Sequence, residues 1–152
     1  MEEVKKKSKK FVYATKVKWL KERVGRVVSS GKPVLEISTP PEFGGKEGIW
    51  APEELFIASV NSCVMTTFLY FANKEKLKFV SFESEAEGIL ERSKRGFWFS
   101  QITLYPKIEV ANEQMIEKAK ALLETAKTHC LISNSIETKV IANPKLVTKE
   151  RM

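Results

Sequence analysis

The N-terminal part of the chain alternates apolar and polar positions, which is the period of a half-buried β-strand. Two shorter strands are predicted over residues 24–29 and 34–38, because turn-forming residues at 30–33 separate them. The three segments together predict an antiparallel meander. The residues that define its first strand are Phe11, Tyr13, Thr15, Val17 and Trp19.

A loop rich in proline and glycine over residues 40–48 leads into a helix that is predicted from Ala51 to about Asn73. Pro52 suits the first helical turn, and Glu53 complements the positive end of the helix dipole. The helix has hardly any polar face, so we expect protein to surround it. Burying every face within one protomer is difficult, which favours a dimer. A membrane span is not expected, because polar residues interrupt the apolar run: Asn61, Ser62, Thr66 and Thr67.

A second β-hairpin is predicted after this helix. Period two returns over about 79–90 and 97–110, and the turn between these segments lies near 91–96. Pro106 predicts that the second of these strands lies at a sheet edge or contains a bulge.

A second helix and a final strand complete the predicted fold. Asn112 is a suitable N-cap, and apolar residues then recur at helical intervals up to Ala126. A short segment over 130–135 precedes a last strand over 137–142. No repeat or linker interrupts the chain. Residues 11–152 are therefore predicted to form a single α+β domain, with helices packed on antiparallel sheet.

The length and the charge narrow the possibilities. A chain of 152 residues buries enough surface to fold without a disulfide or a structural metal. Its net charge of +7 owes much to lysines within residues 1–10, which are predicted to form a basic, flexible arm. No apolar signal-type segment opens the chain, so we expect a cytoplasmic location, where permanent disulfides are disfavoured.

The two cysteines are the chemically informative residues. Cys63 lies on the predicted apolar helix among small polar residues, and Cys130 precedes a Ser-Asn-Ser segment at 133–135. A cysteine that only fills a core needs no such neighbours, so the pattern indicates thiol chemistry. A zinc site that combines both cysteines with His129 is not favoured, because structural zinc usually takes four ligands in paired spacing.

The cysteine contexts and their flanking motifs resemble the OsmC/Ohr family of osmotically inducible and organic hydroperoxide resistance proteins. The resemblance extends from about Phe11 to Ala142. It implies an intertwined α+β homodimer that acts as a thiol-dependent peroxidase on organic hydroperoxides, without a cofactor. The matching features are Pro52-Glu53-Glu54-Leu55-Phe56, Cys63 ten residues after Glu53, His129-Cys130-Leu131-Ile132-Ser133-Asn134 and the preceding Gly44-Gly45 loop.

The resemblance also implies roles for individual residues. Cys63 matches the peroxidatic cysteine, Cys130 the resolving cysteine and Glu53 the active-site glutamate, while Arg23 matches the active-site arginine best and Arg26 is the alternative. A guanidinium ~4 Å from a sulfur favours the thiolate by about 4 kcal/mol at an effective dielectric of about 20. A carboxylate at Glu53 could hold that guanidinium in place. The implied reductants are lipoyl-bearing proteins or small dithiols.

Helix geometry bears on how these groups meet. Glu53 and Cys63 are ten residues apart, which is about 15 Å along a continuous helix and roughly 80° around it. Either the first helical turn departs from the axis, or Arg23 and Glu53 come from the opposite subunit, and we favour the second arrangement. Residues within two turns of Cys63 predict a partly apolar wall that suits alkyl hydroperoxides: Phe56, Val60, Thr67 and Tyr70.

A different class of function is a basic nucleic-acid-binding module with structural cysteines. Trp98 and its aromatic neighbours follow a turn that contains Arg92, Lys94 and Arg95, and such combinations stack and neutralise single strands. Aromatic residues that alternate along paired strands are more often packing residues, however. We therefore expect a hydroperoxide substrate, a dithiol reductant and a second copy of the chain as partners, and neither a membrane nor a nucleic acid.

Overall fold

The computed structural model describes residues 8–149. The chain forms two compact units, unit 1 up to Pro52 and unit 2 from Glu53 onward, which are described in turn. The predicted basic arm falls largely on residues outside the described range. Lys9 and Lys10 are exposed and precede the first strand. The boundaries predicted for the arm and for a single domain stay predictions.

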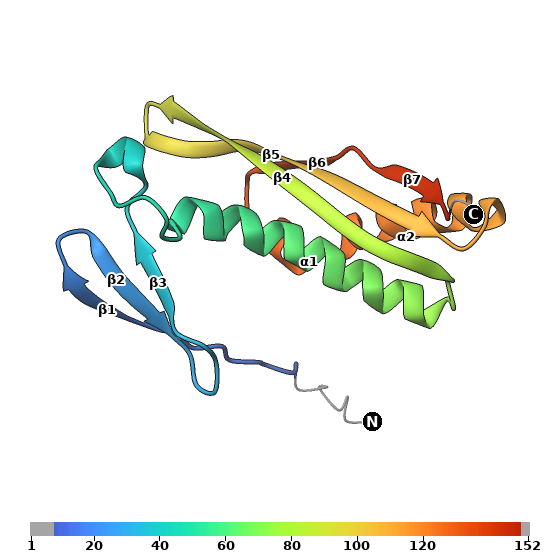
Figure 1. The fold of residues 1–152 in the computed structure, drawn as a ribbon, viewed down its shortest axis with the longest axis horizontal. Helices are drawn as coiled ribbons and strands as arrows, with labels where there is room; N and C mark the ends of the chain where they lie inside the picture. The colour runs from blue at the N-terminus through green and yellow to red at the C-terminus, as the bar shows by residue number, and fades with distance from the viewer. Residues whose placement is uncertain (1–7, 150–152) are drawn as a thin grey trace, which may run out of the picture. The chain divides into compact units, whose positions relative to one another are not determined.

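Unit 1 contains an antiparallel sheet of three strands in the order β1-β2-β3 (Figure 1). The predicted meander is confirmed, but its first strand begins at Lys16 and not at Phe11. The pairing of β1 with β2 ends where Lys16 faces Val28, so residues 11–15 have no opposing strand to receive their backbone hydrogen bonds. The strands are β1, Lys16–Lys21, β2, Val24–Val28, and β3, Leu35–Ser38.

The sheet of unit 1 has an apolar face and a charged face, because successive strand residues point to opposite sides. Val17 of β1 is aligned with Val27 of β2 on the apolar face. On the charged face Lys18 is aligned with Arg26, which in turn faces Glu36 at an Nη2–Oε1 distance of 3.8 Å. The apolar face stays open in one chain, since Val17 is 69% exposed.

Unit 2 contains a long antiparallel hairpin to which two short parallel strands are added. The hairpin and its turn were predicted, and so was β6 within two residues, whereas β7 was not. Both short strands pair with β5, one after the other. The strands are β4, Phe79–Ser93, β5, Gly96–Val110, β6, Lys139–Ala142, and β7, Lys145–Thr148.

Pro106 predicted a sheet edge or a bulge in its strand; the edge is wrong, whereas the strand does contain a bulge, away from the proline. β5 has strands on both sides. Its register with β4 shifts between Phe79 and Ser81 and again where Ile89 and Leu90 face Gln101 and Phe99. Proline is tolerated in this inner strand because the missing N–H faces the break between β6 and β7. The sheet therefore loses no hydrogen bond there.

Three helices accompany the strands, and the predicted long helix is confirmed to within one residue at each end. Its first residue, Pro52, is the last of unit 1. A 3-10 turn that starts after Asn112 precedes the second helix, and Asn112 is the N-cap residue of that turn but makes no side-chain capping hydrogen bond. The helices are α1, Pro52–Lys74, α2, Ile116–His129, and α3, Leu131–Asn134, and the 3-10 turn is η2, Glu113–Met115.

Unit 2 is a two-layer structure in which α1 and α2 pack on the inner face of the sheet (Figure 1). On α1 every fourth residue is buried, from Val60 to Ala72, which is the spacing of one helix face. The Phe68 ring packs against Phe79 and Phe82 of β4, with ring centroids 5.6 and 5.2 Å away. The core also contains Ile102, Leu104, Ile108, Val110, Ala119, Leu122, Leu123, Ala126 and Cys130.

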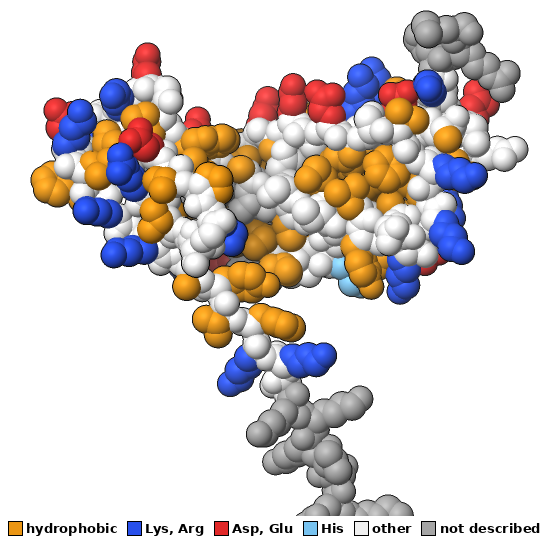
Figure 2. Space-filling model, turned by 60° about the horizontal axis from the view of Figure 1, so that its bottom comes forward, with side chains coloured by type: hydrophobic (Ala, Val, Ile, Leu, Met, Phe, Trp, Pro, Cys, Tyr) orange, Lys and Arg blue, Asp and Glu red, His pale blue; other side chains and the backbone are white. Residues whose placement is uncertain are grey.

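The remaining sides of α1 are less buried. Among the described residues, α1 is the one helix long and apolar enough to cross a membrane by length and composition, a test that core helices also pass. Figure 2 shows hydrophobic side chains in orange on the surface of one face. Leu69 and Tyr70 of α1 are among the exposed large hydrophobic residues, and so is Trp19 of β1. One protomer thus does not supply the complete enclosure that the sequence predicts for this helix.

Candidate thiol site

Cys63 lies in the middle of α1, next to the buried row of that helix, and is partly exposed. Its side chain packs against the core of unit 2. The hydroxyls beside it bond mainly to the helix backbone: Thr66 and Thr67 donate to the Cys63 carbonyl at 3.1 and 2.7 Å. Such back-bonding satisfies short polar side chains inside an apolar helix. The polar context of Cys63 is therefore partly a local helical feature.

Cys130 lies at the junction of α2 and α3, where it ends one helix and is the N-cap of the next. Its side chain is completely buried in the core of unit 2. Asn134 secures the junction, because its N–H donates to the Cys130 carbonyl at 3.0 Å and its side-chain amide donates to the Thr128 carbonyl at 3.0 Å. The backbone around the thiol is thus held from both helices.

The two cysteines, which are far apart in the sequence, are neighbours in unit 2. Cys130 belongs to the core cluster against which Cys63 packs, and the Cys63 thiol is near enough to affect the pKa of Cys130. Both thiols are free rather than joined in a disulfide. Helix α1 brings one sulfur to the core, and the turn between α2 and α3 brings the other. Two thiols in this relation can form a disulfide after one of them is oxidised.

The environment of Cys130 acts on its protonation in both directions. Burial raises the pKa of the Cys130 thiol above its ordinary value, and the nearby Cys63 raises that pKa further. The hydroxyl and the backbone N–H of Ser133 lower it, because they favour the charged sulfur. Burial is the largest of these effects, so Cys130 rests as a protonated thiol.

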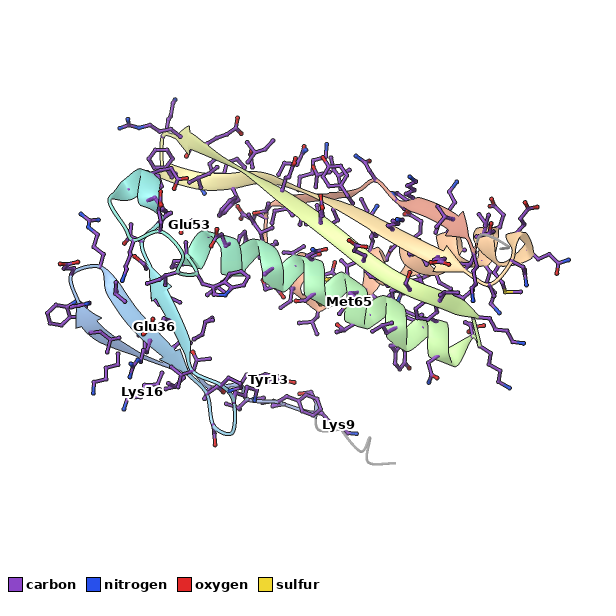
Figure 3. The ribbon with its side chains drawn as sticks, viewed as in Figure 1. Lys9, Tyr13, Lys16, Glu36, Glu53 and Met65 are labelled. Atoms are coloured by element: carbon purple, nitrogen blue, oxygen red, sulfur yellow. The ribbon has the colours of Figure 1, made fainter. Side chains whose placement is uncertain are left out.

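Glu53 lies in the first turn of α1 (Figure 3). Its Oε2 atom is buried and has no hydrogen-bond partner among the described residues. A buried carboxylate oxygen in this condition is a natural site for a cation or a hydrogen-bond donor. Glu53 therefore has the property that a residue holding an arginine would need.

Arg23 and Arg26, the two candidate arginines, belong to unit 1 and differ in their surroundings. Arg26 faces Glu36 on the sheet, whereas Arg23 follows the turn after β1 and donates from Nη1 to the Phe43 carbonyl at 3.1 Å. Arg23 also lines an open pocket of about 410 Å³, which favours it over Arg26 as a ligand-binding group. The pocket is lined by Glu22, Arg23, Val24, Ser38, Gly44, Gly45 and Lys46.

The Gly44-Gly45 loop shapes this pocket and follows a 3-10 turn, η1, Pro41–Phe43. Gly44 has a φ of 83°, in the left-handed region. At Gly45 a Cβ atom would lie 1.3 Å from the Thr39 carbonyl oxygen, so only glycine fits there. The loop can therefore fold back beside Arg23 because both positions lack a side chain.

The predicted substrate-contacting residues lie in different surroundings. Phe56 stacks on Phe99 of β5 with ring centroids 5.1 Å apart, and Val60 is completely buried in the core. Thr67 donates to the Cys63 carbonyl, while Tyr70 is 61% exposed. That these four residues line a substrate-binding wall stays a prediction. Val60 is the least accessible of the four.

His129 is exposed and placed for structural contacts. Its Nδ1 lies 2.9 Å from the Thr125 carbonyl, which requires Nδ1 to be the protonated nitrogen, and its ring packs edge-on against Phe71. Among residues 8–149, no group of three or more His, Cys, Asp or Glu side chains could hold a metal ion. His129 thus supports the end of α2 and has no ligand role in the described structure.

The basic turn near Trp98 lies at the tip of the β4–β5 hairpin, and Trp98 is 44% exposed there. Arg92, Lys94 and Arg95 are exposed at the same tip. The described residues show no further feature that would bind a nucleic acid at this position.

Asn61 and Ser133 of unit 2 each have a buried polar atom without a hydrogen-bond partner among the described residues. Asn61 donates from Nδ2 to the Ser84 carbonyl of β4 at 2.8 Å, and its Oδ1 is buried without a partner among the described residues. Ser133 Oγ is likewise buried, and it lies beside the Cys130 sulfur. The sequence could have indicated Asn61, because its amide is isolated on an apolar helix. It could not have indicated Ser133, because the position of that hydroxyl depends on how α3 folds.

Comparison with known proteins agrees with this arrangement. The sequence profile described as OsmC-like protein matches residues 44–144, about two-thirds of the chain, including both cysteines. The chain belongs to the OsmC-like protein family. The family sequence match begins at the Gly44-Gly45 loop, so Arg23 lies outside it.

Known members similar to this OsmC-like chain include one curated relative and several solved structures. The uncharacterized protein YmaD of Bacillus subtilis is 26% identical over 116 residues, which are 74% of this chain and 77% of that protein. An OsmC-like protein of unknown function from Vibrio cholerae superposes with a TM-score of 0.82 at 23% identity, over 89% of this chain and 99% of that one.

A further structure carries a functional name. The organic hydroperoxide resistance protein OsmC of Legionella pneumophila superposes with a TM-score of 0.71 at 28% identity, over 91% of this chain and 99% of that one. The α+β fold predicted from the sequence is therefore confirmed, and so is the OsmC/Ohr family. Family and names together support a redox role connected with peroxides.

Proposed function

We propose that this protein is a thiol-dependent peroxidase that reduces organic hydroperoxides, with Cys63 as the peroxidatic cysteine and Cys130 as the resolving cysteine. The observation that carries the proposal is that the two thiols are neighbours within unit 2. Their difference in burial sets the order of the steps. Cys63 is partly exposed and accessible to a peroxide, whereas Cys130 is completely buried and stays protonated until it is needed.

The chemistry proceeds in two balanced steps. The Cys63 thiolate attacks the terminal oxygen of the hydroperoxide, the O–O bond breaks, and the departing alkoxide takes up a proton to become an alcohol. Cys63 is left as a sulfenic acid. Cys130 loses its proton, its sulfur attacks the Cys63 sulfur, and hydroxide leaves with a proton as water. The product is a Cys63–Cys130 disulfide, which an external dithiol reduces to regenerate both thiols.

Arg23 and Glu53 complete the proposed site. A guanidinium close to Cys63 would hold the sulfur in its charged form, since opposite charges favour ionisation. The buried Glu53 Oε2, which has no partner among the described residues, suits the opposite side of the same guanidinium. Arg23 is preferred over Arg26, because Arg26 is already close to Glu36. We propose that Arg23 and Glu53 act with Cys63 at an interface between two subunits.

A homodimer is thus part of the proposal. Trp19 is 72% exposed in unit 1, and Leu69 and Tyr70 of α1 are exposed in unit 2. Exposed large apolar side chains on each unit favour association with a second chain. Sedimentation velocity at micromolar concentration should give twice the mass of the chain. A monomer under these conditions would contradict the interface arrangement.

The substrate and reductant follow from the same chemistry. Apolar groups near Cys63, among them Phe56 on α1, favour an alkyl or aryl hydroperoxide over hydrogen peroxide. The proposed reductant is a small dithiol or a lipoyl-bearing protein, either of which supplies the two electrons that the disulfide requires. A reducing cytoplasm is the proposed location, because it keeps such dithiols available.

The decisive test uses the reduced protein without any reductant present. One equivalent of cumene hydroperoxide should be consumed with the loss of both free thiols, and Cys63→Ser should abolish the reaction. Hydrogen peroxide should react more slowly, and equal rates would remove the preference for organic substrates. Unchanged consumption by Cys63→Ser would overturn the enzyme proposal and favour a structural role for both cysteines.

A further inference from the structure

The hydroxyl of Ser133 is buried without a conventional partner. Its Oγ has no hydrogen-bond partner among the described residues, sulfur atoms included. Its polar neighbours at the end of α3 do: Ser135 Oγ donates to the Leu131 carbonyl at 2.7 Å, and Asn134 Nδ2 donates to the Thr128 carbonyl at 3.0 Å. A buried hydroxyl that stabilises nothing costs free energy, so this group calls for an explanation.

The group next to that hydroxyl is the Cys130 sulfur. Both the hydroxyl and the N–H of Ser133 act on Cys130 and lower the pKa of its thiol, against the larger effect of burial. A neutral thiol is a weak hydrogen-bond acceptor, whereas a thiolate is a strong one. The contact is therefore weak in the resting state and becomes strong when Cys130 is charged.

The geometry of the α2–α3 junction keeps the two side chains together. The Asn134 N–H donates to the Cys130 carbonyl at 3.0 Å, which closes a turn around Leu131, Ile132 and Ser133. The Asn134 side chain holds the same turn to the end of α2 through Thr128. These bonds hold the backbone of Ser133 in the same turn as Cys130.

We propose that Ser133 assists the resolving step by donating its hydroxyl hydrogen to the Cys130 sulfur as that sulfur becomes the nucleophile. The inference rests on the proposed peroxidase function. Cys130 gives up its proton, attacks the sulfur of the Cys63 sulfenic acid and displaces hydroxide, which leaves as water after protonation. Ser133 keeps its own proton throughout. It stabilises the negative charge on Cys130 only between deprotonation and formation of the S–S bond.

The size of the effect follows from general values. A hydrogen bond to a buried ion changes its population by about ten- to hundredfold. A thiolate made less basic is also less nucleophilic, with a Brønsted coefficient of about 0.4–0.5, so only part of that gain reaches the rate. Loss of the Ser133 hydroxyl should thus slow disulfide formation about three- to tenfold at neutral pH.

The first test measures Cys130 alone and requires no peroxidase activity. In a Cys63→Ser background, the ultraviolet absorbance of the Cys130 thiolate is followed against pH. Adding Ser133→Ala should move the midpoint upward by about one to two pH units. Ser135→Ala is the matched control, because Ser135 is the C-cap of the same helix and its hydroxyl bonds to the Leu131 carbonyl, and it should leave the midpoint in place. Equal midpoints with and without Ser133 would overturn the inference.

The second test measures the resolving step in the chain with both cysteines. Ser133→Ala should consume the first equivalent of cumene hydroperoxide at the normal rate, while the Cys63 sulfenic acid, trapped with dimedone, persists about three- to tenfold longer. Ser133→Thr keeps a hydroxyl and should restore the lifetime. An unchanged lifetime in Ser133→Ala would contradict the inference. If Cys63→Ser itself still consumes peroxide, the peroxidase proposal fails, whereas the thiolate titration still decides whether Ser133 acts on Cys130.

Thermal unfolding separates this role from a purely structural one. Ser133 Oγ satisfies no oxygen or nitrogen in the described structure, so its removal should leave the melting temperature unchanged or slightly higher. A clear fall in the melting temperature together with an unchanged thiolate midpoint would show that Ser133 is only structural.

Discussion

The thiols of Cys63 and Cys130 are neighbours in unit 2 although one is partly exposed and the other is completely buried. This asymmetry assigns different tasks to two chemically identical groups. The accessible sulfur can meet a bulky hydroperoxide, and the buried sulfur is protected from oxidation until its neighbour becomes electrophilic. A pair of equally exposed thiols would lack this order.

Removing Cys130 should separate the two chemical steps. We expect Cys130→Ser to consume one equivalent of cumene hydroperoxide at a rate within about twofold of the unmodified protein, because the attacking thiol is untouched. The product should be a sulfenic acid that dimedone labels, and turnover with a dithiol should fall steeply. Mass spectrometry of the labelled Cys63 peptide checks this prediction. Loss of the first turnover would instead show that Cys130 is needed for peroxide attack.

The raised pKa of Cys130 makes stability depend on alkaline pH. The folded state holds this proton more tightly than the unfolded chain does, so the stabilisation is fully present below the ordinary pKa of 9.0. It is lost as the pH rises through the higher folded value. Under reducing conditions, the free energy of unfolding should decline above about pH 9, with a slope of up to about 1.4 kcal/mol per pH unit from this group.

Cys130→Ser is the control. Its free energy of unfolding can differ from that of the unmodified protein, but above about pH 9 it should decline less steeply, by up to about 1.4 kcal/mol per pH unit. Urea unfolding at several pH values provides the comparison, since lysine and tyrosine titrations are shared by both proteins. Identical slopes would mean that burial does not hold the Cys130 proton.

A mixing experiment distinguishes a site within one subunit from a shared site. Arg23→Ala and Cys63→Ser should each be inactive as homodimers. If Arg23 acts on the partner's cysteine, a mixed dimer contains one site with both groups intact. Unfolding the two variants together and refolding them should then restore about a quarter of the normal activity, because half of the dimers are mixed and each regains one of two sites. No recovery in verified mixed dimers would place both groups in the same subunit.

The loop beside Arg23 should depend on Gly45 far more than on other glycines of unit 1. A Cβ at Gly45 would lie 1.3 Å from the Thr39 carbonyl oxygen, so Gly45→Ala must displace backbone and should cost several kcal/mol, on the order of 3 or more. Gly31→Ala is the comparison, since nothing lies within 4 Å of its Cβ and only its φ of 72° opposes the change. That variant should lose about 1 kcal/mol. Equal losses in thermal unfolding would contradict the close approach at Gly45.

Local patterns predicted most of the secondary structure. The hairpin of β4 and β5 follows from residue spacing, because one face of a strand repeats every second residue. The helix from Pro52 to Lys74 follows from its N-terminal proline and acidic residues and from the apolar run behind them. Strand β7 was not predicted, and it depends on pairing with the distant strand β5. Pro106 does not mark a sheet edge, because an inner strand accepts a proline where its missing N–H faces the break between β6 and β7.

The sequence by itself determined which groups carry the chemistry, because residue type decides that a thiol, a guanidinium or a carboxylate is available at all. Only the tertiary structure decided that Cys63 meets Cys130, that one of them is buried, and that the Ser133 hydroxyl lies beside the buried sulfur. These relations depend on the packing of α1 against the junction of α2 and α3. Distance and burial arise from contacts between segments far apart in the chain, and no local spacing encodes them.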